Sequence, residues 1–145
     1  MKQALILAQR AVTHDDVPIG AVIVRDGKII ARGENRVQIK RNPTLHAEIV
    51  AINQACKKIG AKFLDDCDIY VTLEPCAMCA TAISLARLRA VYFAAQDPKG
   101  GGIISNARIY ETDRHLWHPD VHEIPEFADA SAQMLRDFFA MRRRK

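Results

Sequence analysis

Hydrophobic and polar positions along the chain follow two periods, one typical of helices and one typical of strands. Apolar residues that recur every three or four positions predict helices, and short apolar runs bounded by turn residues predict strands. In chain order we expect a helix over residues 4–12, strands over 19–24 and 28–32, a helix over 44–59, a strand over 68–72, a helix over 75–85, strands over 90–94 and 120–124, and a final helix from about residue 125.

Residues that favour turns and helix ends mark where these elements stop. Asp26-Gly27 is a tight-turn dipeptide that joins the first two strands into a hairpin. Thr44 is the predicted N-cap of the second helix, and Pro75 is predicted to open the third. Residues 98–102, which read Pro-Lys-Gly-Gly-Gly, predict a mobile loop.

The order of the elements predicts the fold class. Strand–helix–strand units make parallel neighbours, whereas the opening hairpin is antiparallel, so the sheet should be mixed. We therefore expect an α/β fold in which a five-stranded sheet is sandwiched by helices. The chain has 145 residues and no internal repeat or linker, which predicts a single domain over residues 1–145.

Composition limits the class of protein. Hydrophobic residues make up 49% and charged residues 26%, which is ordinary for a globular domain that needs no disulfides. The longest stretch without a charge, residues 75–86, is well short of a bilayer span, and no signal peptide is evident. We expect a soluble, cytoplasmic protein with no membrane association, whose four cysteines are metal ligands or core thiols.

Positive charge gathers in two places. The formal net charge is +4, and much of the excess lies in residues 142–145 (Arg-Arg-Arg-Lys) and in Lys40-Arg41. Basic clusters suit an anionic partner such as RNA. A solvated, frayed helix end would have the same composition, so both interpretations stay open.

Two short motifs carry the candidate metal site: His46-Ala47-Glu48 and Pro75-Cys76-Ala77-Met78-Cys79. Each lies at the start of a predicted helix. Cys76 and Cys79 are three residues apart, so both sulfurs point from the same side of the first turn and can reach one ion. With His46 they make three ligands, which leaves the fourth position of a tetrahedral zinc to water, as in catalytic zinc sites.

Glu48 has a different predicted role, that of moving protons between water and substrate. Two alternatives use the same cysteines: a redox-active Cys-x-x-Cys, or a structural zinc with a fourth soft ligand. Such a ligand would come from Cys56, Cys67, His115, His118 or His122. We expect Cys56 and Cys67 to be core residues instead, and a structural site has no use for Glu48.

Several segments together resemble a known family. They are residues 17–22, Asn42-Pro43-Thr44 with the His-Ala-Glu motif, residues 70–79, residues 97–101, and Phe138-Phe139 with the arginines that follow. His-x-Glu followed by Pro-Cys-x-x-Cys is the signature of zinc-dependent nucleobase deaminases. The chain resembles the cytidine-deaminase-like superfamily and, within it, the bacterial tRNA-specific adenosine deaminases.

The resemblance implies a three-layer α/β/α sandwich, a Zn²⁺ cofactor and a homodimer. It also implies hydrolytic deamination of the wobble adenosine in a tRNA anticodon stem-loop, a base that must be flipped into the pocket. By the same resemblance, Asn35 should contact the flipped base, and Asp97 and Lys99 should border the groove for the flanking nucleotides.

Other features keep alternatives open. Residues 116–119 (Leu-Trp-His-Pro) replace paired polar residues that are usual in the family, so this segment departs from the RNA contacts that the resemblance implies. Residues 56–67 resemble bacterial guanine deaminases, which makes a free purine-base deaminase the second candidate. A zinc-stabilised RNA-binding module is the alternative that is not an enzyme.

Overall fold

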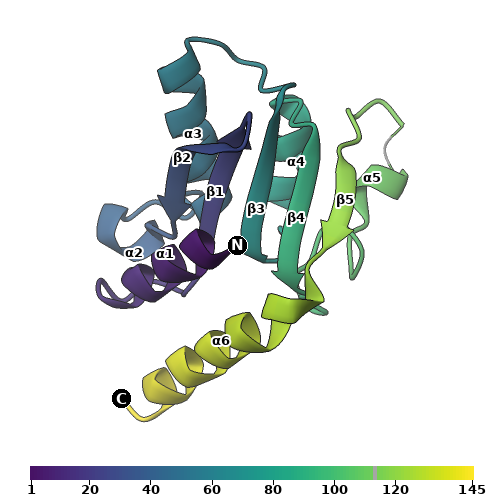
Figure 1. The fold of residues 1–145 in the computed structure, drawn as a ribbon. Coiled ribbons are helices and arrows are strands. Elements are labelled where there is room, and N and C mark those ends of the chain that lie inside the picture. The colour runs from purple at the N-terminus through teal and green to yellow at the C-terminus, as the bar shows by residue number, and fades with distance from the viewer. Residues whose placement is uncertain (113) are drawn as a thin grey trace.

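The computed structural model describes residues 1–112 and 114–145, and it contains a five-stranded sheet with helices on both faces (Figure 1). The strands are β1 (Gly20–Arg25), β2 (Lys28–Glu34), β3 (Cys67–Leu73), β4 (Ala90–Ala95) and β5 (Asp120–Glu123). The helices are α1 (Lys2–Val12), α2 (Val37–Lys40), α3 (Ala47–Ile59), α4 (Ala77–Leu85), α5 (Ile109–Thr112) and α6 (Ala128–Arg143), and a 3₁₀ turn, η1 (Pro125–Phe127), precedes α6.

The sheet is mixed, as predicted. Its strand order is β2-β1-β3-β4-β5, in which β1 is antiparallel to both β2 and β3, while β3, β4 and β5 are parallel to one another. Figure 1 shows α3 and α4 behind the sheet and α1 and α6 in front of it. The prediction of a sheet sandwiched by helices is therefore confirmed.

The main hydrophobic core lies between the sheet and the α3–α4 layer. Alternate residues of the three central strands point into it, including Ile23, Ile69 and Phe93, all of which are fully buried. On the edge strand, Gly33 lets α3 approach the backbone of β2 closely, because a Cβ there would lie 2.1 Å from the carbonyl oxygen of Ala47. The beginning of α3 is thus fixed against the end of β2.

Two predicted helix starts are wrong by two residues. Thr44 is not the N-cap, because its backbone N–H and its hydroxyl both bind Oδ1 of Asn42 in a local turn, and α3 begins only at Ala47. Likewise α4 begins at Ala77 rather than at Pro75. The residues that immediately precede the two helices are His46 and Cys76, both with extended backbone conformations.

The structure also contains two short helices, α2 and α5, that were not predicted. Four residues each are too few to show a helical period in the sequence. In residues 1–112 and 114–145, no helix is long and apolar enough to cross a bilayer.

Candidate metal centre and active site

The beginnings of α3 and α4 bring the three predicted metal ligands together. His46 and Cys76 each precede a helix, and Cys79 lies one turn into α4. Nδ1 of His46 is 3.6 Å from Sγ of Cys76 and 3.6 Å from Sγ of Cys79. The three candidate ligand atoms all lie within 4.8 Å of one another.

These distances fit a tetrahedral cation. Zinc–sulfur bonds of about 2.3 Å and zinc–nitrogen bonds of about 2.0–2.1 Å, at a tetrahedral angle, place sulfur and nitrogen about 3.6 Å apart. In the part of the chain that the structure describes, no other group of three His, Cys, Asp or Glu side chains converges in this way. The cluster can therefore hold a metal ion with three protein ligands.

The other cysteines lie outside the cluster. Sγ of Cys56 is 4.0 Å from the carbonyl oxygen of Lys62, and the fully buried Cys67 has its Sγ 3.4 Å from Oδ1 of Asp66. The ring of His122 stacks on Tyr92 instead of approaching the metal cluster. None of these candidates for a fourth soft ligand joins the three residues.

The electrostatics of the cluster favour cation binding. A hydrogen bond from the Cys79 thiol, followed by one from His46, lowers the pKa of Cys76 to about 4, against the opposing effect of burial. The hydrogen bond to Cys76 and burial raise the pKa of Cys79, because the two sulfurs share one proton. A cation with affinity for thiolates can replace that proton and the histidine's proton together.

Glu48 is buried beside this cluster with part of its carboxylate unsatisfied. Only 3% of its surface is exposed, and Oε2 is buried with no hydrogen-bond partner among residues 1–112 and 114–145. Burial raises the pKa of Glu48 above its ordinary value. A buried acceptor without a partner is costly, so its retention points to a proton on a substrate or a water as its partner.

Asn35 is oriented by the same helix beginning. Its Oδ1 accepts a hydrogen bond of 2.8 Å from the backbone N–H of Ala47, the residue between His46 and Glu48. Because Oδ1 faces Ala47, the Nδ2 group of Asn35 points away from Ala47 and can donate a hydrogen bond to another partner. The backbone on either side is also held, since the carbonyl oxygen of Asn35 lies 3.2 Å from Nε2 of His14.

Asp97 and Lys99 lie on the loop after β4, and this loop has more internal hydrogen bonds than its glycines suggest. Oδ1 of Asp97 accepts hydrogen bonds from the backbone N–H groups of Lys99 and Gly100, at 3.2 and 3.1 Å. Asp97 is thus a turn-forming residue, and the Lys99 side chain is exposed. The backbone N–H of Gly102 donates to the carbonyl oxygen of Pro75 at 2.7 Å, which ties the loop to the segment that carries Cys76.

Glu74 holds this loop, and sequence reasoning missed its role. The side chain is 2% exposed, and its carboxylate accepts hydrogen bonds from the backbone N–H groups of Asp97, Ile103, Ile104 and Ser105 and from the Ser105 hydroxyl. Burial alone would raise the pKa of Glu74, but these hydrogen bonds outweigh it and lower the pKa. The available signal was a charged residue between an apolar strand and Pro75, which does not reveal its partners.

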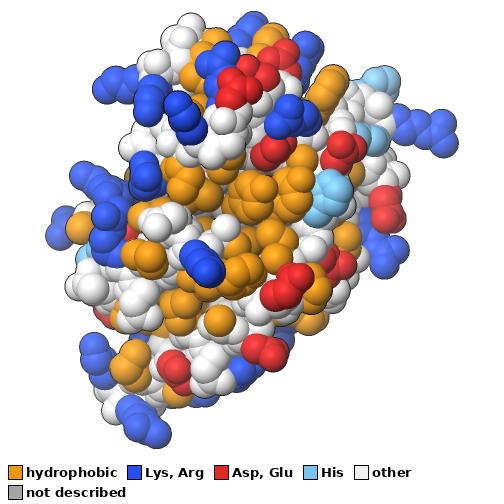
Figure 2. All heavy atoms as spheres, in the orientation of Figure 1, with side chains coloured by type: hydrophobic (Ala, Val, Ile, Leu, Met, Phe, Trp, Pro, Cys, Tyr) orange, Lys and Arg blue, Asp and Glu red, His pale blue; other side chains and the backbone are white. Residues whose placement is uncertain are grey.

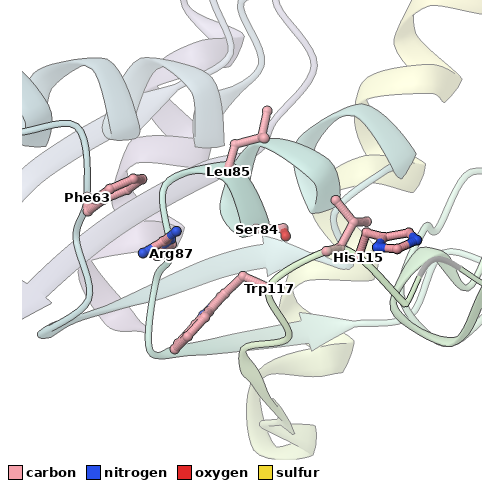
Figure 3. A pocket seen from close by; sticks show the side chains of 7 residues that line it. Phe63, Ser84, Leu85, Arg87, His115 and Trp117 are labelled. Carbon is pink, nitrogen blue, oxygen red and sulfur yellow. The ribbon is translucent and has the colours of Figure 1, made fainter.

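The unusual segment at residues 116–119 lies at the other end of α4. Nε1 of Trp117 donates to the carbonyl oxygen of Leu88 at 3.0 Å. Figure 3 shows Trp117 with Phe63 and Leu85 around a pocket of about 410 Å³. Along the helix axis, Leu85 in the lining of this pocket is about 13 Å from Cys76 and about 9 Å from Cys79, so the pocket lies at the end of α4 away from the two cysteines. It is therefore separate from the candidate metal centre.

Comparison with known proteins identifies the family. The sequence model of the MafB19-like deaminases matches residues 1–143. The chain belongs to this family. Over 143 residues, this deaminase is 47% identical to the tRNA-specific adenosine deaminase of Agrobacterium fabrum, with 99% of this chain and 93% of the relative covered. The guanine deaminase of Bacillus subtilis is 50% identical over 97 residues, which is 66% of this chain and 62% of that protein.

Solved structures give the same relationships. A structure from work on A-to-I editing by tRNA:A34 deaminases matches with a TM-score of 0.89 and 47% identity, covering 93% of this chain and 97% of that chain. The guanine deaminase structure from Bacillus subtilis matches with a TM-score of 0.64 and 45% identity, covering 77% and 66%. The fold class predicted from the sequence is confirmed.

Proposed function

We propose that this deaminase is a zinc-dependent hydrolase that converts the wobble adenosine of a tRNA anticodon stem-loop to inosine. The observation that carries the proposal is the buried, unpartnered Oε2 of Glu48 beside the His46–Cys76–Cys79 cluster. A structural metal site needs no such carboxylate, whereas hydrolytic deamination needs a group that moves protons.

His46, Cys76 and Cys79 are the proposed ligands of Zn²⁺, which makes bound water a nucleophile near neutral pH. Glu48 takes one proton from the attacking water and delivers it to the neighbouring ring nitrogen, and it then moves the second proton from the new hydroxyl group to the departing amino group. The oxygen of water bonds to adenine's C6, the C6–N bond breaks, and ammonia leaves. The Nδ2 group of Asn35 donates to the base, and Asp97 and Lys99 border the flanking nucleotides.

Three observations favour tRNA over a free base as substrate. The tRNA-specific relative covers nearly the whole chain, whereas the guanine deaminase match covers about two thirds of it. The chain is basic, with a net charge of +4. Residues 143–145 at the end of α6 are exposed and basic. A polyanionic partner suits such a surface.

The assembly is part of the same proposal. We infer a single deaminase domain over residues 1–145 that forms a homodimer in the cytoplasm, where tRNAs are read. Met78 and Leu85 of α4 are 37% and 67% exposed, and apolar side chains on the helix that carries two metal ligands suit burial against a second copy.

The deciding experiment incubates the zinc-loaded protein with an adenosine-containing anticodon stem-loop and, separately, with guanine and cytidine. We expect inosine in the digested stem-loop and none when Glu48→Gln replaces the wild type. Turnover of guanine without turnover of the stem-loop would make the protein a guanine deaminase. Binding of the stem-loop with no turnover of any substrate would leave only the RNA-binding module.

A further inference from the structure

A second cleft lies over the β2 edge of the sheet, between the two helical layers. It has a volume of about 350 Å³ and is bounded by α1, β2, the turn after β2, and α3. The lining residues are Arg10, Arg32, Gly33, Glu34, Arg36, Val50 and Gln54. Figure 2 shows Lys and Arg side chains gathered along this edge of the molecule, beside β2 and α2 at the left of the view.

One buried carboxylate organises two of the arginines. Glu34 is 2% exposed, and its oxygens lie 2.6 Å from Nε of Arg10 and 3.3 Å from Nη2 of Arg36. The hydrogen bond to Glu34 also raises the pKa of Arg10. The cleft therefore holds three guanidinium groups and one carboxylate, which pairs with two of them, so it keeps an excess of positive charge.

Donors remain available in this cleft. The Arg36 side chain is 38% exposed, and among the described residues its buried Nε has no hydrogen-bond partner. Within residues 1–112 and 114–145, the exposed side chain of Arg32 forms no ion pair, and its backbone N–H is bound by Oε1 of Gln54 at 2.7 Å. Because this N–H group is already bonded, it is not free to pair with a further strand at the β2 edge of the sheet.

The cleft begins close to the candidate active site. Arg36 directly follows Asn35, the proposed base contact. Along α3, the backbone N–H of Val50 donates to the carbonyl oxygen of His46 at 3.0 Å, so Val50 is one turn from the metal ligand. The cleft thus extends from about 6 Å to about 12 Å beyond His46 along the helix axis.

We propose that this cleft binds a backbone phosphate of the RNA next to the target adenosine. Guanidinium groups match phosphate oxygens with paired N–H donors, and Glu34 fixes two of them in advance. The inference rests on the proposed function, because the phosphate belongs to the RNA whose adenosine enters the metal site. Arg32 and Arg36 supply the donors, and Arg10 adds charge at the far wall.

The test compares two variants that each remove one positive charge from β2. Arg32→Gln changes the cleft, and Lys28→Gln changes the exposed opposite end of the same strand. With the zinc-loaded protein and a stem-loop RNA, we expect Arg32→Gln to raise Kd about three- to tenfold at about 0.1 M salt and to reduce the slope of log Kd against log salt by about 0.7 to 1. The loss should lie in KM rather than in kcat, and Lys28→Gln should change Kd less than about twofold.

Stem-loops in which one phosphate group is neutral identify the phosphate that the cleft contacts. Stem-loops are made with a single methylphosphonate at each position near the target adenosine. At one position the wild type should lose affinity, while Arg32→Gln should lose almost none, because the contact is already gone. Equal losses in both proteins at every position would overturn the inference, as would equal Kd values for the two variants. The proposed function fails separately, if the wild type leaves the unmodified stem-loop adenosine unchanged.

Discussion

Replacing Glu74 by glutamine tests how the loop after β4 is held against the segment that carries the metal ligands. The substitution keeps the size of the side chain but removes its charge and one acceptor oxygen. In the wild type, Oε2 accepts three backbone N–H groups, while Oε1 accepts the N–H of Asp97 and the Ser105 hydroxyl. The glutamine amide fits best with its NH₂ group at the Oε1 position, since the hydroxyl can rotate to accept while the three N–H groups cannot.

The loss of stability in Glu74→Gln follows from the hydrogen bonds that the substitution removes or weakens. The N–H of Asp97 then faces another donor, and the remaining bonds lose their charge assistance. Hydrogen bonds to a charged group contribute about 1.5–3 kcal/mol, and a buried donor left unpaired costs about 1–3 kcal/mol. We expect Glu74→Gln to lower the free energy of unfolding by about 2–4 kcal/mol and to raise KM for the RNA, because Asp97 and Lys99 lose their support.

Denaturant unfolding of the zinc-loaded protein and hydrogen exchange at Ile103, Ile104 and Ser105 measure this effect. Glu111→Gln is the matched control, because the Glu111 side chain is 64% exposed and its ion pair among the described residues is with the exposed Arg108. That variant should stay within about 0.5 kcal/mol of wild type. If Glu74→Gln were as stable as the control and its three amides exchanged no faster, the anchoring role assigned to Glu74 would be refuted.

The remaining predictions concern the metal, the proton-moving residue and the basic tail. The protein should bind one zinc per chain, and Cys76→Ser should lose it while Cys56→Ser and Cys67→Ser keep it; equal losses in metal analysis would contradict the three-ligand site. Glu48→Gln should lower turnover at least about 10²-fold with zinc content unchanged. Because burial raises the pKa of Glu48, its ionisation destabilises the fold above the pKa of the unfolded chain but not below it, so this variant should unfold at a higher temperature at neutral pH. Deleting residues 143–145 should weaken RNA binding and reduce the dependence of Kd on salt, but it should not lower the melting temperature. Arg142→Ala should lower the melting temperature, since Nη2 of Arg142 lies 3.0 Å from Oδ2 of Asp15. If the deletion left the RNA affinity unchanged, residues 143–145 would not belong to the RNA interface.

Local spacing in the sequence was enough to predict the elements and the candidate metal ligands. Strand–helix–strand order determines that β3 and β4 are parallel neighbours, and a three-residue spacing puts Cys76 and Cys79 on one side of a turn. These features depend on residues that are close along the chain. His46 was predicted as the third ligand because catalytic zinc has three protein ligands, but its spacing of 30 residues from Cys76 does not by itself place the two side by side.

The tertiary structure decided the features that depend on distant residues. Glu74 binds a loop up to 31 positions away, and Glu34 pairs with Arg10 across 24 positions. Neither set of partners can be predicted from the sequence pattern, because a glutamate is the same residue type whether its carboxylate is solvated or buried with five hydrogen-bond donors. The local turn around Asn42 likewise displaced the predicted start of α3. Asp15 accepts a hydrogen bond from Arg142, for which the sequence left open an anionic partner or a solvated helix end. Burial and long-range hydrogen bonding arise only when the chain is folded, so they determine how each charged residue is used.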